Sequence, residues 1–161
     1  MKLLSYEEFE QGIELIELRQ GSLFGALSDE GIRYLIAQGK LWFLDPSDIL
    51  YEAGDPSNHF FIVLSGELQF TKVHAGLQLV TRNVEFGEEV GFVSMISLQP
   101  YGGHVEALTD SIVLDIDCNL YATFGTEHPQ DFGIFTLNLA RNMARNIQRL
   151  SARLVENSIN H

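Results

Sequence analysis

The sequence predicts a mainly β domain with helices at both ends, and three observations support this. Short runs rich in β-branched and aromatic residues recur between Lys40 and Asp117, separated by turn signals such as Gly54-Asp55-Pro56. Strands at this spacing are typical of an antiparallel sandwich or barrel rather than of alternating βαβ units. Helical patterns precede and follow this region. A chain of 161 residues, 45% of them hydrophobic, is long enough to bury one core.

Two helices are expected before the β region. Ser5, followed three residues later by Glu8, fits a capping box, and apolar residues then continue at helical spacing as far as Ile16. The pair Gln20-Gly21 is expected to end this helix. A second, shorter helix is expected from Ser28 to Gly39, because Ser is a preferred N-cap residue and Gly a frequent helix terminator.

Six β-rich runs form the central region, and each is bounded by Gly, Pro, Asp or Ser residues that favour turns. Such a series predicts strands that pair with their neighbours across short turns. The runs are residues 41–44, 60–64, 68–73, 77–80, 104–108 and 111–114.

The last segment predicts a long helix that begins near 127–131, where acidic residues and Pro129 suit a helix start. Apolar residues then recur with alternating steps of three and four, which is the pattern of a coiled-coil seam. The stripe packs either on the chain's own β region or on the same helix of a second copy, and its narrow width favours the second copy. The seam residues are Ala140, Met143, Ile147, Leu150 and Leu154.

The charge balance argues against nucleic acids and anionic membranes as partners. The chain holds 10 basic and 22 acidic residues, a net charge of −12, which repels phosphates at long range. Four of the arginines lie after residue 140, where a solvated helix face is favoured over an anion contact. The sequence contains neither a run of about 20 apolar residues nor a signal-peptide pattern at its start, so a cytoplasmic protein is expected.

Catalytic and metal-binding patterns are missing from the sequence, so we expect no enzyme and no metal site. None of the five histidines stands in an H-x-H or H-E-x-x-H pair. Cys118 is the only cysteine, which excludes an internal disulfide and favours a buried structural thiol. Glu88 and Glu89 are adjacent carboxylates, but they lie in an expected turn and are expected to be solvated.

Five segments of the chain form a pattern in their order and spacing: Phe24 with Leu27-Ser28, Ile49–Asp55, Phe60–Leu68, Gly87–Gly91 and Val105–Asp110. Together they resemble the cyclic nucleotide-binding domains over roughly residues 22–155. The resemblance is closest to catabolite activator-type effector domains, but the chain ends a few residues after Leu154, so no helix-turn-helix module and no DNA binding are expected. It implies a β-roll, a double-stranded β-helix or jelly roll, in residues 1–130 and a dimerisation helix in residues 131–161.

The resemblance also implies a phosphate-binding cassette, from which this sequence departs at both charged positions. In the family, a glutamate after the cassette glycine binds the ribose hydroxyl, and an arginine after the cassette proline binds the phosphate. Here Gly91 is followed by Phe92, and Pro100 is followed by Tyr101. Aligning Gly87-Glu88 with the Gly-Glu pair is rejected because it leaves too many residues before the next strand.

A candidate small-ligand pocket is therefore expected around the cassette. Arg82, on the preceding strand, and Arg141 or Arg145, on the last helix, are compensating cations within reach, although a solvated position is the favoured expectation for each. The candidate pocket residues are Phe70, Arg82, Val90, Gly91, Phe92, Val93, Tyr101, Gly102, Gly103 and Arg145.

The expected function is a non-enzymatic regulatory or sensor module with weak or lost affinity for cyclic AMP and cyclic GMP. A cyclic nucleotide or another, less charged small ligand is the candidate occupant, and its binding is expected to reposition the C-terminal helix. The alternative is a ligand-free interaction scaffold whose pocket is closed by Phe92. The expected partners are a second copy of the chain and an unidentified protein.

Overall fold

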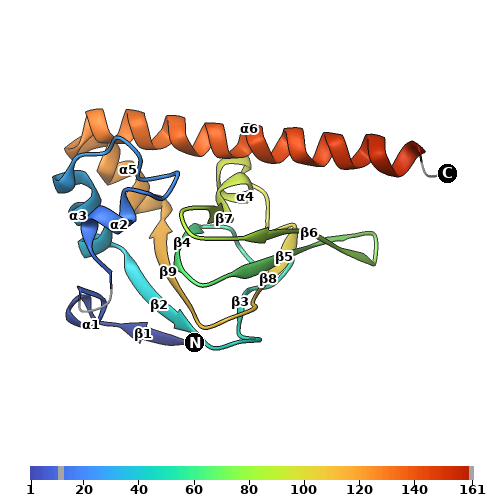
Figure 1. Cartoon of the computed structure of the whole chain (residues 1–161), viewed down its shortest axis with the longest axis horizontal. Helices are drawn as coiled ribbons and strands as arrows, with labels where there is room; N and C mark the ends of the chain where they lie inside the picture. The colour runs from blue at the N-terminus through green and yellow to red at the C-terminus, as the bar shows by residue number, and fades with distance from the viewer. Residues whose placement is uncertain (11–12, 160–161) are drawn as a thin grey trace.

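The computed structural model describes residues 1–10 and 13–159 and shows two antiparallel sheets with one long helix across them (Figure 1). The first sheet contains, in spatial order, β1 (Lys2–Leu4), β2 (Lys40–Leu44), β9 (Ser111–Asp117), β4 (His59–Ser65) and β7 (Glu89–Val90). The second contains β3 (Ile49–Tyr51), β8 (Gly103–Ala107), β5 (Leu68–His74) and β6 (Leu77–Val84). This is the jelly-roll fold with flanking helices that the sequence predicts.

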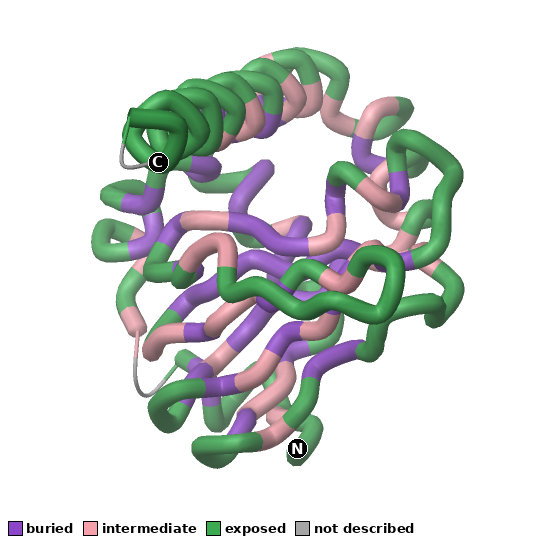
Figure 2. The backbone as a smooth tube through the Cα atoms, turned by 90° about the vertical axis from the view of Figure 1, so that its right-hand side faces the viewer, coloured by how far each residue is buried: buried purple, intermediate pink, exposed green. Residues whose placement is uncertain are grey.

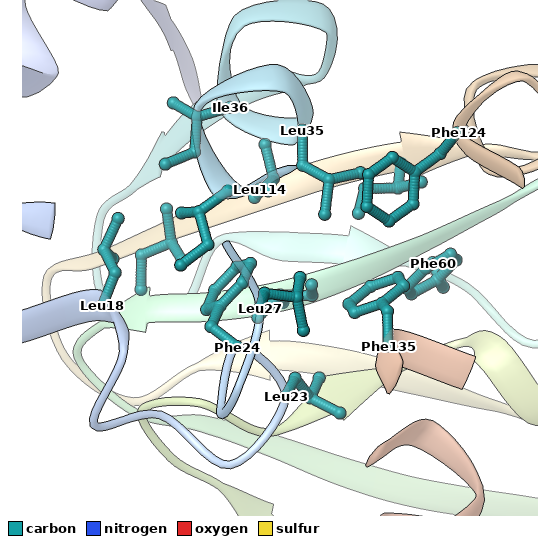
Figure 3. Close-up of a cluster of buried hydrophobic side chains, with 14 of the residues drawn as sticks. Leu18, Leu23, Phe24, Leu27, Leu35, Ile36, Phe60, Leu114, Phe124 and Phe135 are labelled. Carbon is teal, nitrogen blue, oxygen red and sulfur yellow. The ribbon is translucent and has the colours of Figure 1, made fainter. Parts of the chain in front are cut away.

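Two apolar clusters hold the domain together, and the buried positions run through the strands (Figure 2). One fills the inside of the roll, where residues such as Val63 and Val113 of the first sheet meet Leu68 and Val105 of the second. The other lies between the first sheet and the helices. Figure 3 shows it around Phe60 of β4, with helical side chains packed on the strands.

The expected first helix is divided into two in the structure. Its predicted capping box is present, because Ser5 N donates to the Glu8 carboxylate (2.8 Å) and Glu8 N donates to Ser5 Oγ (3.2 Å). However, α1 covers only Tyr6–Glu10, and α2 covers Leu15–Leu18. Glu14 explains the second start, since its extended backbone and its own capping box with Glu17 begin α2. Residues 11–12 lie outside the described part of the chain.

The second expected helix is confirmed as α3 (Asp29–Gln38), with Ser28 as its N-cap and Gly39 as its C-cap. Three features differ from expectation. The strand β1 pairs with β2, and the short strand β7 lies where a turn was expected. Cys118 is exposed rather than buried, at the first position of α5 (Cys118–Glu127), because the chain leaves β9 for the surface there.

The long helix α6 (Pro129–Ile159) enters the core of the domain with its first half. Phe135 and Leu139 are fully buried in the helix-side cluster. Asp131 accepts hydrogen bonds from Ser28 N (2.8 Å) and Ser28 Oγ (2.5 Å). Asn138 donates to two backbone carbonyls of the segment between α2 and α3. After residue 150 every described helical residue is exposed, and the helix runs past the roll (Figure 1).

None of the helices among the described residues has the length and apolar character needed to cross a bilayer.

Replacing Asp131 tests the fixed end of α6. Asp131→Ala leaves the Ser28 N–H and hydroxyl without their buried acceptor, which costs about 1–3 kcal/mol of unfolding free energy. Urea denaturation measures the loss. The matched control is Gln130→Ala, the exposed neighbour on the same turn, for which a change within about 0.5 kcal/mol is expected. Equal stability of the two variants would contradict the fixing role of Asp131.

Candidate ligand-binding site

A cavity of about 480 Å³ lies between the roll and the second half of α6. Its volume falls within the roughly 300–1,000 Å³ typical of small-molecule sites. The roll wall comes from β5, β6, β7 and the short helix α4 (Phe92–Ser97), and the opposite wall comes from α6. Because α6 forms one wall, the shape of the cavity depends on where α6 lies.

The roll wall combines aromatic rings with two cations. Residues two apart on a strand share a face, so Phe70 and Lys72 of β5 both point into the cavity, and Arg82 of β6 lies opposite Phe70 in the register. Tyr51 of β3 adds a ring that stacks on Tyr101 with centroids 3.7 Å apart. The wall is therefore apolar over most of its surface, with positive charge at its edge.

Arg82 and Glu89 form a buried charged pair at the floor of the cavity. The Arg82 Nη2 donates to the backbone carbonyl of Glu89 (2.7 Å) and lies 4.0 Å from its carboxylate. The Glu89 carboxylate, only 1% exposed, also accepts from Phe92 N (3.0 Å). Burial raises the pKa of the Glu89 carboxyl, and Arg82 and the Phe92 N–H oppose that rise. The expectation that Glu89 is solvated in a turn is wrong, because β7 carries it into the sheet.

The α6 wall is apolar with polar groups at intervals of one turn. Met143, Ile147 and Leu150 face the cavity from three successive turns, and Asn146 lies between them. Two arginines of α6 reach the roll beyond these residues. Arg149 lies 3.8 Å from the Glu88 carboxylate, and Arg153 donates to the carbonyl of Thr81. These two contacts tie the second half of α6 to the roll.

Six of the ten predicted pocket residues line this cavity. They are Phe70, Arg82, Val90, Gly91, Val93 and Gly102. Arg82 was expected to be solvated, but its side chain is mostly buried at the cavity floor because β6 turns it inward. Phe92, Tyr101, Gly103 and Arg145 do not line the cavity. Arg145 is exposed on α6, whereas Arg149 and Arg153 contact Glu88 and Thr81 of the roll.

Phe92 does not close the cavity, because its side chain points away into the helix-side core. It is 1% exposed and packs edge-on against Phe60 (5.1 Å between ring centroids) and Tyr121 (5.7 Å). Gly103 lies behind the wall, where a Cβ would meet the Phe70 ring at 2.7 Å. Tyr101 also supports the wall from behind, with its hydroxyl donating to the His59 carbonyl (2.6 Å).

Several cavity residues were missed by the sequence analysis, among them Tyr51, Lys72, Glu89 and Asn146. The alternation Phe70-Thr71-Lys72 on an expected strand was a usable signal for Lys72, since Phe70 was already assigned to the pocket. The burial of Glu89 had no local signal. No group of three or more metal-ligating side chains occurs among residues 1–10 and 13–159.

The model of the cyclic nucleotide-binding domain family matches residues 41–120. Through these residues the chain belongs to that family. The match extends from β2 to the start of α5 and includes the roll wall of the cavity, whereas α6 lies beyond it.

Comparisons with individual proteins agree with this assignment. A cyclic nucleotide-binding domain from Methylobacillus flagellatus superposes with a TM-score of 0.81, at 19% identity, over 97% of this chain and 88% of that one. Catabolite Activator Protein of Thermus thermophilus gives 0.71 at 19% identity, over 86% of this chain and 63% of its own. At these identities the likeness shows the fold alone.

A curated relative is Lysophospholipase NTE1 of Cryptococcus neoformans var. neoformans, which is 28% identical over 107 residues. The match spans 66% of this chain but only 6% of that protein. The chain therefore corresponds to a small part of the relative.

The raised pKa of Glu89 predicts a specific pH dependence. A carboxyl whose pKa is higher in the folded chain than in the unfolded chain binds its proton more tightly when folded, so its contribution to stability falls as pH rises. Glu89→Gln, which stays neutral, should therefore gain unfolding free energy relative to the wild type as pH rises above about 4, the ordinary range of a glutamate carboxyl. Urea denaturation at several pH values measures this difference.

If the unfolding free energy of the wild type instead rose relative to that of Glu89→Gln as pH increased, the pairing of Glu89 with Arg82 would outweigh its burial. The matched control is Glu88→Gln, because Glu88 is the adjacent carboxylate and lies nearer to solvent. No comparable slope is expected for it.

Proposed function

We propose that this domain is a non-enzymatic regulatory module in which a small ligand, bound between the roll and α6, changes the position of α6. The observation that carries the proposal is the shared cavity, because one wall belongs to the roll and the other to the half of the helix that lies outside the core. A ligand shifts such an equilibrium only by contacting the two arrangements differently. An occupant of this cavity meets that condition, since it touches Met143, Ile147 and Leu150 directly.

High affinity for cyclic AMP or cyclic GMP is not part of the proposal. The two charged positions of the family cassette hold Phe92 and Tyr101, and neither side chain faces the cavity. Losing a hydrogen bond to a charged group costs about 1.5–3 kcal/mol, and each 1.4 kcal/mol is a tenfold loss of affinity. Two such losses weaken the binding of an ordinary cyclic nucleotide by about two to four orders of magnitude.

The alternative of a ligand-free scaffold receives less support. It required Phe92 to fill the pocket, whereas Phe92 packs against Phe60 and Tyr121 in the core. For the same reason, restoring a glutamate at position 92 would bury a carboxylate among aromatic rings rather than rebuild a ribose contact.

We also propose that the domain acts as a homodimer through α6. Ile147 and Leu154, one heptad apart in the seam, are 64% and 69% exposed. Apolar residues repeated in this way are stable in water when a second helix covers them. Ligand-driven movement of α6 then changes the surface that the dimer offers to a protein partner.

The ligand proposal predicts weak binding of cyclic AMP and cyclic GMP, with dissociation constants no tighter than about 1 μM. Isothermal titration calorimetry on the full chain measures both. A sub-micromolar constant for either nucleotide would contradict the proposed loss of affinity.

Hydrogen–deuterium exchange at a saturating concentration of the nucleotide tests the coupling to the helix. Exchange should slow in residues 143–159 of α6 and stay constant in residues 131–139, which are fixed to the core. Binding without any change after residue 143 would contradict the coupling.

The dimer proposal predicts that Leu154→Asp produces a monomer. Leu154 lies in the seam, outside the cavity, so a carboxylate there blocks helix pairing without altering the ligand site. Sedimentation velocity over a range of concentrations measures the assembly. Gln148→Asp, an exposed position of α6 outside the seam, is the matched control and should remain a dimer. An unchanged dimer for Leu154→Asp would contradict the pairing.

A further inference from the structure

The strongest unassigned feature of the cavity is a set of cations on strands rather than in the cassette. Lys72 lies two residues after Phe70 on β5, and Arg82 lies opposite Phe70 on β6. All three line the cavity. The ammonium of Lys72 stands directly over Gly102, in the space that a side chain at Gly102 would occupy. Gly102 follows Tyr101, so the positive charge lost from the cassette is present nearby on a different strand.

Neither cation is fully engaged within the described part of the chain. Lys72 has no ion-pair or side-chain hydrogen-bond partner among residues 1–10 and 13–159. Arg82 uses Nη2 for the Glu89 carbonyl, whereas its Nη1 is buried without a partner. A buried donor without an acceptor costs about 1–3 kcal/mol, and a bound anionic oxygen would remove that cost.

The opposite wall carries an unpaired acceptor. The Oδ1 of Asn146, on α6, is also buried without a partner among the described residues, and Asn146 lines the same cavity. Because an amide oxygen accepts hydrogen bonds, it suits an N–H or O–H group on the body of the ligand rather than its anionic oxygens. Tyr51, Phe70, Ile147 and Leu150 between them supply the apolar surface for its body.

We infer that the cavity binds an anion with an apolar, ring-sized body, whose negatively charged oxygens are held by Lys72 and Arg82. The inference rests on the proposed function and names the ligand class of the same site. Carboxylates, phosphates and sulfonates share this chemistry. Glu89 neutralises much of the Arg82 charge and Glu88 lies beside Arg149, so Lys72 and Arg153 provide the net positive charge that selects an anion over a neutral molecule of the same shape.

Two fluorescent probes that share one ring system separate charge from shape. Both 8-anilinonaphthalene-1-sulfonate and N-phenyl-1-naphthylamine carry the anilinonaphthalene body, but only the first carries a sulfonate. Fluorescence titration of the full chain should show the sulfonate binding about tenfold more tightly, as expected for about one charge-assisted hydrogen bond. The preference should shrink as salt is raised, because Lys72 is exposed to solvent on one side.

Variants assign the preference to particular side chains. Lys72→Gln should lower the affinity for the sulfonate probe about tenfold and leave the affinity for the neutral probe unchanged. Lys40→Gln, an exposed lysine on β2 outside the cavity, is the matched control and should change neither. Arg82→Lys keeps a positive charge beside Glu89 but removes the guanidinium Nη1. It should therefore lower the affinity for the sulfonate probe and leave that for the neutral probe unchanged.

A cavity-filling variant locates the probes. Val93 of α4 is exposed and lines the cavity, so Val93→Trp is tolerated by the fold, leaves the helix seam unchanged and should weaken both probes. Equal affinity for the two probes, or an unchanged sulfonate affinity in Lys72→Gln, would overturn this inference while leaving the regulatory proposal intact. Binding of neither probe, or binding that Val93→Trp does not affect, would contradict both.

Discussion

The attachment of α6 at one end is the constraint on which the rest of the structure depends. Asp131 and Asn138 bond to the segment around α3, and Phe135 enters the core, so the first half of the helix cannot move without opening that core. The second half meets the roll mainly through the cavity and through Arg149 and Arg153. One continuous helix thus has a part that is held in the core and a part that forms a wall of the cavity.

The space under α6 is open because the aromatic side chains at the two cassette positions point elsewhere. Phe92 packs into the helix-side core and Tyr101 stacks behind Tyr51, so neither occupies that space. The floor of the cavity buries the Glu89 carboxylate, with Arg82 beside it. A buried carboxylate of this kind is tolerated only with such partners, and this links the floor of the cavity to the stability of the domain.

The fold was predictable because its signals are local. Alternation along the strands, the Ser28 cap and the Gly-Asp turn at Gly54 each depend on a few adjacent residues. The site was only partly predictable, because its decisive contacts join distant residues. The burial of Glu89 depends on the pairing of β7 with β4, and the direction of Phe92 depends on helices that pack around it. The apolar spacing predicted one helix as far as Ile16, whereas the capping box of Glu14 begins a second helix, α2.

The length of α6 determines how far its free end moves when the helix tilts about the part that is held in the core. The helix has 31 residues, and about 20 of them follow the last residue held in the core, a span of roughly 30 Å at 1.5 Å per residue. A tilt of about 10° around the fixed end would carry the tip through about 5 Å, as follows from that length. Because the tip lies far from Phe135 and Leu139, any tilt of the helix displaces the tip more than it displaces the wall of the cavity.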